Sequence, residues 1–470
     1  MSLVTARGGA DLRASLSGRL VCVAGLGVTG ESAVRALNQL GAEVVVSEAA
    51  PQRQQERLDR LQADGIAVRL VEELPPGTTL LLVSPGWRPS QPLVVAAADR
   101  GVPVWGDAEL ARRLNPDLPW LAVTGTNGKT TTVHMLTQML LAAGHRAVSA
   151  GNVGTALLDV VTGGDVDVVA VELSSFQLHY TQQVDAVASA VLNVSDDHLD
   201  WHGSMAQYAA DKGRIHRSTS TAAIFNVADP VTFDVISDTG AECRRVGFTL
   251  GTPAAEQIGV VEDLIVDRAF VDDATEAVEL ARLADVEPAA PHNVANALAA
   301  AGLARAFGVP AAAVRQGLAA FSPQPHRLAY VSTHRGVAYV DDSKATNPHA
   351  AQAALSSFDS IVWIAGGLAK GADFDQLAAT AGSRIRCAVL IGADRDVIAD
   401  AFRRHAPHVP LIDVPETDNT VMVRAVTAAA AAASPGDTVL LAPACASMDL
   451  FADYADRGRS FVAAVDRLVE

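Results

Sequence analysis

An apolar segment that runs into a glycine-rich turn constrains this chain more than any other part of its sequence. Trp120–Thr124 has the composition of a buried β-strand, Gly125–Thr131 forms the turn, and a helical pattern follows. In such a strand, loop and helix, backbone N–H groups point at phosphate oxygens, Lys129 supplies a positive charge, and the Thr130 hydroxyl can join a Mg²⁺ shell. Val123 stands where the strict Walker spacing has glycine, so a plain glycine-rich β–α turn is the alternative. We predict a site for ATP or GTP.

Length and periodicity indicate an α/β protein of several domains. A chain of 470 residues is too long for one core and suits about three domains at the usual ~100–200 residues each. β-type and helical patterns alternate from Leu20 to the end, which favours mainly parallel sheets. Proline-containing stretches at 115–119 and 322–325 suit interdomain joints. We therefore predict domains at 1–116, 117–323 and 324–470.

Composition and charge limit the partners. The longest apolar runs fall short of the ~18 residues needed to span a bilayer. Residues 1–15 lack an apolar signal core, and we expect them to fray. Four widely spaced cysteines without a CxxC pair predict neither zinc nor disulfides, which fits a reducing cytoplasm. A net charge of −17 disfavours nucleic acid and anionic membranes as partners.

A second glycine-rich turn, Gly25–Gly30, lies between a predicted strand and a predicted helix. Its glycines would let the backbone approach a diphosphate at a helix N-terminus, and Glu48, after the next strand, could accept a hydrogen bond from a ribose hydroxyl. Tight contact between strand and helix would explain the same glycines. Ser84–Gly86 follows another apolar strand and either ends it as a turn or lines the same cleft.

Polar residues follow two predicted strands of the central block. The strand at 167–171 leads to Glu172, and the strand at 188–194 leads to His198. Because ligands of open α/β sheets gather at such strand ends, we expect both side chains beside the phosphate loop, holding divalent ions. Mg²⁺ prefers oxygen ligands, so a histidine is less expected there. An exposed strand-end acid and a hydrogen-bonded loop histidine are the alternatives.

The residues alone leave the roles of three further groups of polar side chains undecided. Lys212 lies in a helical stretch, where a surface lysine is the simplest interpretation. Asn293 and Asn296 occupy neighbouring positions at a helix start, where they could contact adenine or ribose, or where Asn293 could cap the helix. The loops at 341–347 and 366–370 carry lysines after predicted strands, which suggests a carboxylate-binding face or solvated loops.

In their order along nearly the whole chain, these segments resemble the Mur ligases of peptidoglycan synthesis. Within that family they are most similar to members that add D-glutamate to UDP-N-acetylmuramoyl-L-alanine. The resemblance implies a Rossmann-like N-terminal domain for the UDP part, a central ATPase domain and a Rossmann-like C-terminal domain that brings the amino acid, in a cytoplasmic protein that we expect to be a monomer. The motifs, of which the last is the most specific, are GLGVTG, SPG, GTNGKTT, ELSSFQL, NVSDDHLDWHG, DDSKATN and LAPACASMDLFADYADRG.

The resemblance also assigns roles to residues. It implies that Lys129 holds the β- and γ-phosphates, that Thr130 and Glu172 bind one Mg²⁺ and that His198 binds a second. Lys212 matches a lysine that becomes carbamylated, which would turn a cation into an anionic metal ligand and make it the fourth catalytic residue with Lys129, Glu172 and His198. The residues expected at ATP are Gly125, Thr126, Asn127, Gly128, Lys129, Thr130, Thr131, Asn293, Asn296, Arg327 and Asp342. The residues expected at the UDP substrate and D-glutamate are Gly27, Val28, Thr29, Glu48, Ser84, Gly86, Asn152, Lys344, Thr346, Lys370, Ser447, Met448 and Tyr454.

The chain departs from the family pattern at three positions. Tyr454 stands where Phe is common, and Leu368 and Glu48 stand where Asp is common. The expected reaction is phosphorylation of a substrate carboxylate by ATP, followed by attack of the amine of D-glutamate on the acyl phosphate. The competing hypotheses are an NAD-dependent oxidoreductase, a nucleotide-gated switch, another amino-acid-adding Mur ligase and a glutamate-adding folate ligase.

Overall fold

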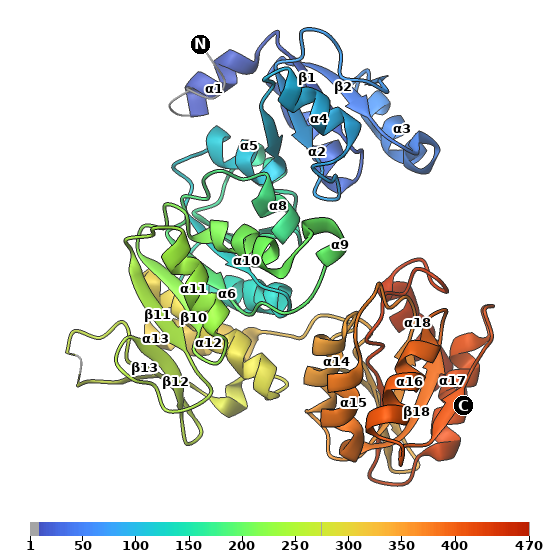
Figure 1. Ribbon diagram of the computed structural model, residues 1–470. Helices are drawn as coiled ribbons and strands as arrows, with labels where there is room; N and C mark the ends of the chain where they lie inside the picture. Colours follow the sequence, from blue (N-terminus) through green and yellow to red (C-terminus); the bar gives the residue numbers. More distant parts are fainter. Residues whose placement is uncertain (1–8, 274, 470) are drawn as a thin grey trace. The chain divides into compact units, whose positions relative to one another are not determined.

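The computed structural model describes residues 9–273 and 275–469, which form three sheets with their helices (Figure 1). Most of the chain up to Phe321 belongs to one compact unit. The second unit starts at Ser322 and also includes Ser195–Asp197 and Glu287–Asn293. One sheet falls within each predicted domain, and the predicted α/β class with mainly parallel strands is confirmed. The predicted domain boundaries themselves stay predictions.

The first sheet has parallel strands in the order β3-β2-β1-β4-β5. The strand order reverses between β1 and β4, and the loops after these strands carry the first glycine turn and Ser84. Open α/β sheets bind ligands at such a switch point. The strands are β1 (Leu20–Ala24), β2 (Glu43–Ser47), β3 (Arg69–Leu70), β4 (Leu80–Val83) and β5 (Val104–Gly106). The helices are α1 (Gly9–Leu16), α2 (Val28–Gln39), η2 (Pro51–Gln54), α3 (Gln55–Ala63), α4 (Pro92–Asp99) and α5 (Asp107–Leu114).

Helix α1 corrects the expectation that the N-terminal residues fray. Residues 1–8 lie outside the described part of the chain, but Gly9–Leu16 is helical. Leu12 and Leu16 are buried in a core that also contains Leu110 and Leu114 of α5. Burial of these two leucines, at about 1.5–3 kcal/mol each, favours the ordered helix and opposes part of the entropy lost when the segment becomes ordered.

The central sheet has the strand order β14-β13-β12-β11-β10-β9-β6-β8-β7. It is parallel from β7 to β12, and only β12, β13 and β14 pair antiparallel. The carboxyl ends of β6, β8 and β9 therefore lie at one edge, as predicted. The strands are β6 (Trp120–Thr124), β7 (Ala147–Gly151), β8 (Val168–Glu172), β9 (Ala188–Val191), β10 (Ala222–Asn226), β11 (Arg244–Phe248), β12 (Gln257–Val261), β13 (Leu264–Asp267) and β14 (Val278–Arg282). The helices are α6 (Lys129–Ala142), α7 (Leu157–Gly163), α8 (Ser175–His179), α9 (Leu199–His202), α10 (Met205–Gly213), η3 (Arg214–His216), α11 (Pro230–Asp238), η4 (Leu283–Asp285), α12 (Pro291–Ala306) and α13 (Ala311–Ala320).

The third sheet has the strand order β15-β16-β20-β17-β18-β19, with only β15 antiparallel. The loops after β16, β17 and β20 hold the lysines and the closing motif predicted to bind a carboxylate, and these strands are neighbours. The strands are β15 (Ala329–His334), β16 (Val337–Asp341), β17 (Ile361–Gly366), β18 (Ile385–Ile391), β19 (Leu411–Asp413) and β20 (Thr438–Leu441). The helices are α14 (Pro348–Leu355), α15 (Asp375–Ala381), η5 (Gly382–Arg384), α16 (Arg395–His405), α17 (Val421–Ala432) and α18 (Tyr454–Val469).

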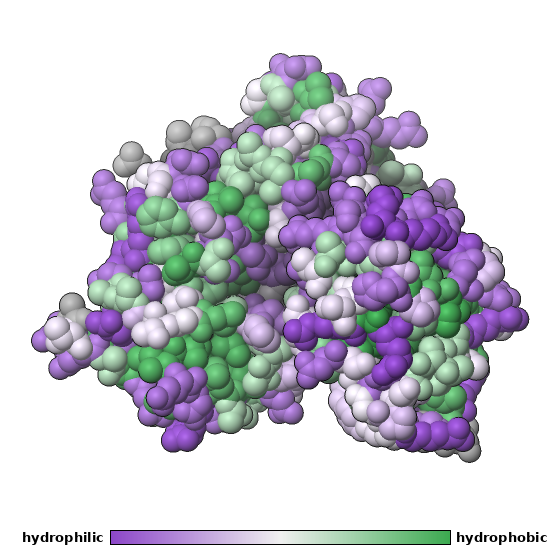
Figure 2. Space-filling model, turned by 60° about the horizontal axis from the view of Figure 1, so that its bottom comes forward, coloured by the Kyte–Doolittle hydropathy of each residue, from purple (hydrophilic) through white to green (hydrophobic). Residues whose placement is uncertain are grey.

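Within the described residues, no helix is both long and apolar enough to cross a membrane. On the face drawn in Figure 2, hydrophilic side chains are mixed with hydrophobic ones.

Candidate functional site

The turn after β6 has the backbone of a phosphate-binding loop. Gly128 precedes α6 in a left-handed conformation with φ 85°, and no side chain caps the start of the helix. An anion at this position would accept hydrogen bonds from the first turn of the helix and would be favoured by the helix dipole. Strand, loop and helix follow one another in the predicted order, which both alternatives share, so phosphate binding at this turn stays a prediction.

Asn193 fixes this loop, and sequence reasoning did not single it out. Its backbone carbonyl accepts from Thr126 N at 2.9 Å, and its side chain exchanges two hydrogen bonds with the backbone of Asn127, at 2.8 and 3.1 Å. Asn193 follows β9, the strand next to β6. The sequence signal that could have identified Asn193 is its position as a polar residue just after a strand that neighbours β6.

Two lysine ammonium groups converge on the carbonyl oxygen of Gly125. Lys129 Nζ donates to Gly125 O at 2.8 Å and to Thr126 O at 2.9 Å, and Lys212 Nζ donates to Gly125 O at 2.9 Å. Lys212 is 1% exposed and lies 4.4 Å from the ring centroid of Tyr208. The interpretation of Lys212 as a surface lysine is therefore wrong. With both side chains unmodified, two cations beside one loop create a positive potential that suits a triphosphate, and carbamylation of Lys212 would leave Lys129 as the cation there.

Glu172 ends β8 beside Val123 of β6 and is 1% exposed, so it is not an exposed strand-end acid. Its Oε1 accepts from Asn152 Nδ2 at 2.8 Å. Its Oε2 is buried and has no hydrogen-bond partner among the described residues. A buried carboxylate oxygen without a donor is costly unless a cation completes its shell, so Glu172 fits a Mg²⁺ ligand. Asn152, predicted at the substrate, holds this carboxylate.

The other predicted metal ligands supply oxygen and nitrogen donors around the same sheet edge. Thr130 lies in the first turn of α6 and is half-buried. His198 precedes α9 in a left-handed conformation with φ 54°, and its ring lies 4.8 Å from that of Phe176. No three His, Cys, Asp or Glu side chains of the described residues form a ready-made metal cluster. This donor set fits Mg²⁺, which keeps waters and shares phosphate oxygens rather than needing an all-protein cage.

Asn296 lies against the phosphate loop. A Cβ at Gly128 would fall 2.2 Å from Asn296 Oδ1, so only glycine permits this approach. Asn293 lies inside α12, which starts at Pro291, and its side-chain amide donates to the carbonyls of Glu287 and Pro288 at 3.4 and 3.2 Å. The capping alternative for Asn293 is therefore wrong, whereas its predicted contact with nucleotide stays a prediction.

The glycine turn after β1 lies beside Glu48 and Ser84. Glu48 Oε2 accepts from Leu26 N at 2.8 Å, and Ser84 Oγ donates to Gly25 O at 3.1 Å. Helix α2 starts at Val28 without a side-chain cap. The structure thus brings these predicted substrate residues together at the switch point of the first sheet.

The glycines of this turn serve both of the alternatives considered. A Cβ at Gly30 would lie 1.9 Å from Gly25 O, so Gly30 permits close contact between strand and helix. A Cβ at Gly27 would meet nothing within 4 Å, which leaves that side of the turn accessible to a ligand. Val28 is 62% exposed beside it, Thr29 is half-buried, and Gly86 is exposed.

In the second unit, Arg327 and Asp342, both predicted at the nucleotide, influence each other electrostatically. Burial raises the pKa of Asp342 to about 7, and the charge of Arg327 acts in the opposite direction. Asp342 Oδ1 accepts from Leu328 N at 3.2 Å. A carboxyl group with this pKa can change its protonation state near neutral pH.

Two of the residues predicted at D-glutamate touch each other. Lys344 Nζ lies 3.7 Å from the ring centroid of Tyr454, a cation–π contact that holds the ammonium at the loop after β16. Ser447 is buried, Thr346 is half-buried, and Met448 and Lys370 are exposed. No hydrogen bond or ion pair joins Lys370 to another described residue. At Leu368 the backbone pairs with Ala446, through bonds of 2.9 and 3.0 Å, and so joins the loop after β17 to the closing motif.

Arg457 is a structural centre of this region that sequence reasoning missed. It is 0% exposed. Its guanidinium donates to Ser343 Oγ at 3.0 Å, Ser343 O at 2.9 Å and Cys445 O at 3.0 Å. It therefore ties the loop after β16 to the loop after β20. Its place inside the closing motif was the only signal.

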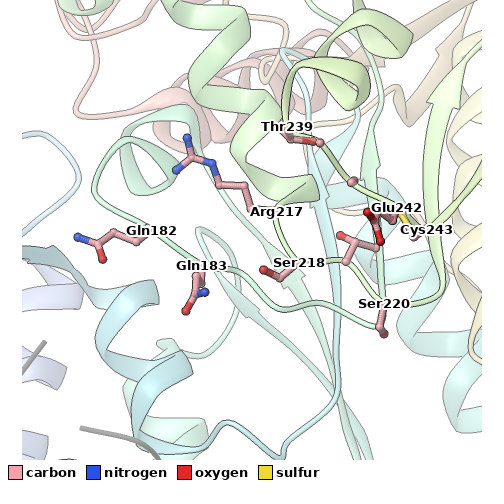
Figure 3. A pocket seen from close by; sticks show the side chains of 11 residues that line it. Gln182, Gln183, Arg217, Ser218, Ser220, Thr239, Glu242 and Cys243 are labelled. Atoms are coloured by element: carbon pink, nitrogen blue, oxygen red, sulfur yellow. The ribbon is translucent and has the colours of Figure 1, made fainter. Parts of the chain in front are cut away.

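A cavity of about 570 Å³ lies elsewhere in the first unit (Figure 3). Its lining comes from the loops before β9, β10 and β11, which are parallel to β6. It therefore lies at the sheet edge opposite the phosphate loop. The lining residues are Gln182, Gln183, Arg217, Ser218, Thr219, Ser220, Thr239, Gly240, Ala241, Glu242 and Cys243, none of which was predicted at the site.

Three family descriptions match the chain in succession. Residues 19–106 match a Mur ligase MurD-like N-terminal domain, residues 123–304 a Mur ligase middle domain, and residues 326–445 a Mur ligase glutamate ligase domain. The UDP-N-acetylmuramoylalanine–D-glutamate ligase of Streptomyces coelicolor is 57% identical, covering 96% of this chain and 98% of that protein. The protein of the same name from Thermobifida fusca is 54% identical, covering 96% and 99%.

Solved structures agree on the fold. The crystal structure of MurF from Acinetobacter baumannii superposes with a TM-score of 0.61 at 18% identity, covering 90% of this chain and 91% of that one. At this identity the likeness concerns the fold alone.

Proposed function

Because the chain belongs to the Mur ligase family, we propose that it is the ATP-dependent ligase that adds D-glutamate to UDP-N-acetylmuramoyl-L-alanine in peptidoglycan precursor synthesis. Relatives with this name align over nearly their whole length. The observation that carries the proposal is the convergence of Lys129, Lys212 and the buried carboxylate of Glu172 at the end of β6 and β8.

The chemistry divides into two transfers. The alanine carboxylate oxygen attacks the γ-phosphorus of ATP, the bond to the β–γ bridging oxygen breaks, and ADP leaves. The amine nitrogen of D-glutamate then attacks the acyl carbon, the acyl–oxygen bond breaks, phosphate leaves and the nitrogen loses a proton. One carboxylate oxygen therefore ends in inorganic phosphate. Direct condensation would require a much poorer leaving group.

The residues of the first unit would act mainly by position and charge, as phosphoryl transfer requires. The first turn of α6 and Lys129 would hold the β- and γ-phosphates. Thr130, Glu172, His198 and carbamylated Lys212 would hold Mg²⁺ at two sites, where it would neutralise charge on the phosphates. Asn296 would contact the nucleotide beside Gly128, and Asn152 would keep Glu172 in place.

The remaining predicted residues would bind the two acceptor substrates. Gly27, Val28, Glu48 and Ser84 would hold the UDP part at the switch point of the first sheet. Lys344, held by Tyr454, would attract a carboxylate of D-glutamate. Thr346, Lys370, Ser447 and Met448 would contribute to the same carboxylate site, and Arg327 and Asp342 to the nucleotide.

The direct test measures release of ADP from ATP in the presence of UDP-N-acetylmuramoyl-L-alanine and a panel of L- and D-amino acids. Among these amino acids, we expect only D-glutamate to support ADP release. We also expect ¹⁸O to pass from the labelled substrate carboxylate into inorganic phosphate. Activity with another amino acid or with a folate would support a different ligase. Hydrolysis of ATP at a rate that does not depend on the amino acid would support a nucleotide switch. Hydride transfer to NAD would support an oxidoreductase.

We also propose that the protein acts in the cytoplasm as a monomer. The substrates support the location, because ATP and UDP-linked precursors are cytoplasmic compounds. Sedimentation equilibrium across a range of concentrations tests the oligomeric state, and a mass of twice the chain would contradict a monomer.

A further inference from the structure

One buried carboxylate joins three short helices, α8, α9 and α10, of which α9 follows His198 and α10 carries Lys212. Asp211, on α10, is 0% exposed. Its Oδ2 lies 2.9 Å from Nδ1 of His179 and 2.9 Å from Nδ1 of His202. These histidines end α8 and α9, and Figure 1 shows the three helices beside one another, as their contacts confirm.

The second carboxylate oxygen of Asp211, Oδ1, also has two polar neighbours. Gln207 Nε2 lies 3.1 Å from Oδ1, and Arg214 Nε lies 3.3 Å from it. An ionised carboxylate only accepts hydrogen bonds, so all four neighbours donate, and Nδ1 of each histidine carries the proton. Such a fully satisfied buried network holds its members in one arrangement.

This network reaches His198 through the ring of His202. The ring of His202 stacks on Phe176 at 5.5 Å between centroids and 6° between planes, and Phe176 lies 4.8 Å from His198. His202 Nε2 also lies 3.0 Å from Ser175 Oγ. Helix α9 has only 4 residues, too few to be stable through its own hydrogen bonds. The position of His198 therefore depends on these tertiary contacts.

The same network reaches Lys212 through α10. Lys212 follows Asp211 in the helix, so the carboxylate fixes the turn from which the lysine reaches Gly125 O. Tyr208, on the same helix, lies 3.1 Å from Thr126 Oγ1 through its hydroxyl and 5.1 Å from the ring of His202. Helix α10 is thereby held against both the phosphate loop and α9.

We propose that Asp211 and His202 are positioning residues for the metal–nucleotide site, which set His198 and Lys212 relative to the phosphate loop. Neither side chain touches the reacting atoms. The inference rests on the proposed roles of His198 and Lys212 as metal ligands. Beyond these roles, the inference assigns a function to the buried network of Asp211 and His202, which holds the elements that carry both proposed ligands.

The test compares Asp211→Asn and His202→Phe with a matched control, His216→Phe. Phenylalanine at 202 keeps the ring that stacks on Phe176 and loses both hydrogen bonds. His216 is a buried histidine of the same unit, with Nδ1 2.7 Å from Ser189 Oγ, outside the Asp211 network. Binding of Mn²⁺ with a non-hydrolysable ATP analogue is measured by electron paramagnetic resonance, and kcat and KM by ADP release.

We expect both test variants to lose Mn²⁺ affinity and kcat about tenfold or more, as for other groups that orient metal ligands. Their KM for D-glutamate should stay within about twofold of wild type, and the control should bind Mn²⁺ as wild type does even if its melting temperature falls. If Asp211→Asn does not fold, His202→Phe decides the question.

Folded variants that bind Mn²⁺ with wild-type affinity would overturn the inference and leave the proposed function intact. Wild-type protein that binds no Mn²⁺–nucleotide would overturn both. A loss of affinity equal in all three variants would show that Asp211 and His202 only stabilise the fold.

Discussion

The side-chain amide of Asn152 donates to one oxygen of Glu172 at 2.8 Å, and the other oxygen is buried without a hydrogen-bond partner among the described residues. Asn152 therefore orients the carboxylate without neutralising it. This arrangement is stable only if something else supplies a positive charge to Oε2. Phosphate-bound Mg²⁺ at the end of β8 would do so.

Replacing Glu172 by Gln should lower kcat by about 10²-fold or more and raise the Mg²⁺ concentration needed for half-maximal rate. Glutamine keeps the shape and an acceptor for Asn152 but removes the charge that would bind the cation. ADP release measured across a Mg²⁺ titration checks this. An unchanged Mg²⁺ requirement would contradict the metal role of Glu172.

Replacing Lys129 by Ala should lower ADP formation by about 10²–10³-fold while binding of the UDP substrate is retained. The ammonium lies over the loop carbonyls and would stabilise charge on the transferring phosphate. Coupled ADP assays and calorimetry with the UDP substrate measure the two effects separately. Near-normal turnover by this variant would exclude the assignment.

The parts of the site that sequence predicted are those in which a local pattern has a fixed structural consequence. The phosphate loop is one, because an apolar strand followed by glycines and Lys129 leads to a single backbone arrangement. Glu172 is another, because parallel strands end at a common edge. Strand bounds were close for the same reason, although β9 ends at Val191, before the predicted end at residue 194.

The parts that sequence missed depend on contacts between distant segments. Asp211 follows no periodic signal, and its role arises only when α8 and α9 are brought against α10. Arg457 is similar, since an arginine in a helix is usually exposed and its burial depends partly on the loop of Ser343, which lies far away in the chain. The local pattern around Lys212 favours a surface lysine for the same reason, and only the resemblance to the Mur ligases places Lys212 at the metal site.

Asp342 should make stability depend on pH. Burial raises its pKa from 3.8 to about 7, so between these values the folded protein holds a proton that the unfolded chain has released. Stability therefore falls as pH rises through this window and levels off above about pH 7, by at most about 1.4 kcal/mol per unit of pKa shift. Asp342→Asn should escape this fall. Urea unfolding of both proteins at pH 5 and pH 8 measures the divergence, and parallel curves would contradict the raised pKa.

Replacing Arg457 by Met should lower the free energy of unfolding of the second unit by about 2 kcal/mol or more, since two buried carbonyl acceptors lose their donor at about 1–3 kcal/mol each. The change leaves Ser343 O and Cys445 O buried without their donor, at a cost that the added hydrophobic contact does not offset. It should also raise KM for D-glutamate, because both loops that carry predicted glutamate residues lose their common anchor. Arg457→Lys should show a smaller form of both effects, since lysine keeps the charge but cannot reach all three acceptors. Equal stability of Arg457→Met and wild type in chemical denaturation would contradict this account.

Replacing Gly128 by Ala should weaken nucleotide binding more than it weakens the fold. Gly128 has φ 85°, where a side chain costs about 1 kcal/mol, and its new Cβ would meet Asn296 Oδ1 at 2.2 Å. The side-chain amide of Asn296 would have to move away from the loop, and the turn before α6 would have to open. Gly163→Ala is the matched control, because a Cβ there meets nothing within 4 Å. Calorimetry with an ATP analogue should give at least about tenfold weaker binding for Gly128→Ala and unchanged binding for Gly163→Ala. Equal affinities for the two variants would show that Gly128 and Asn296 do not form part of the nucleotide site.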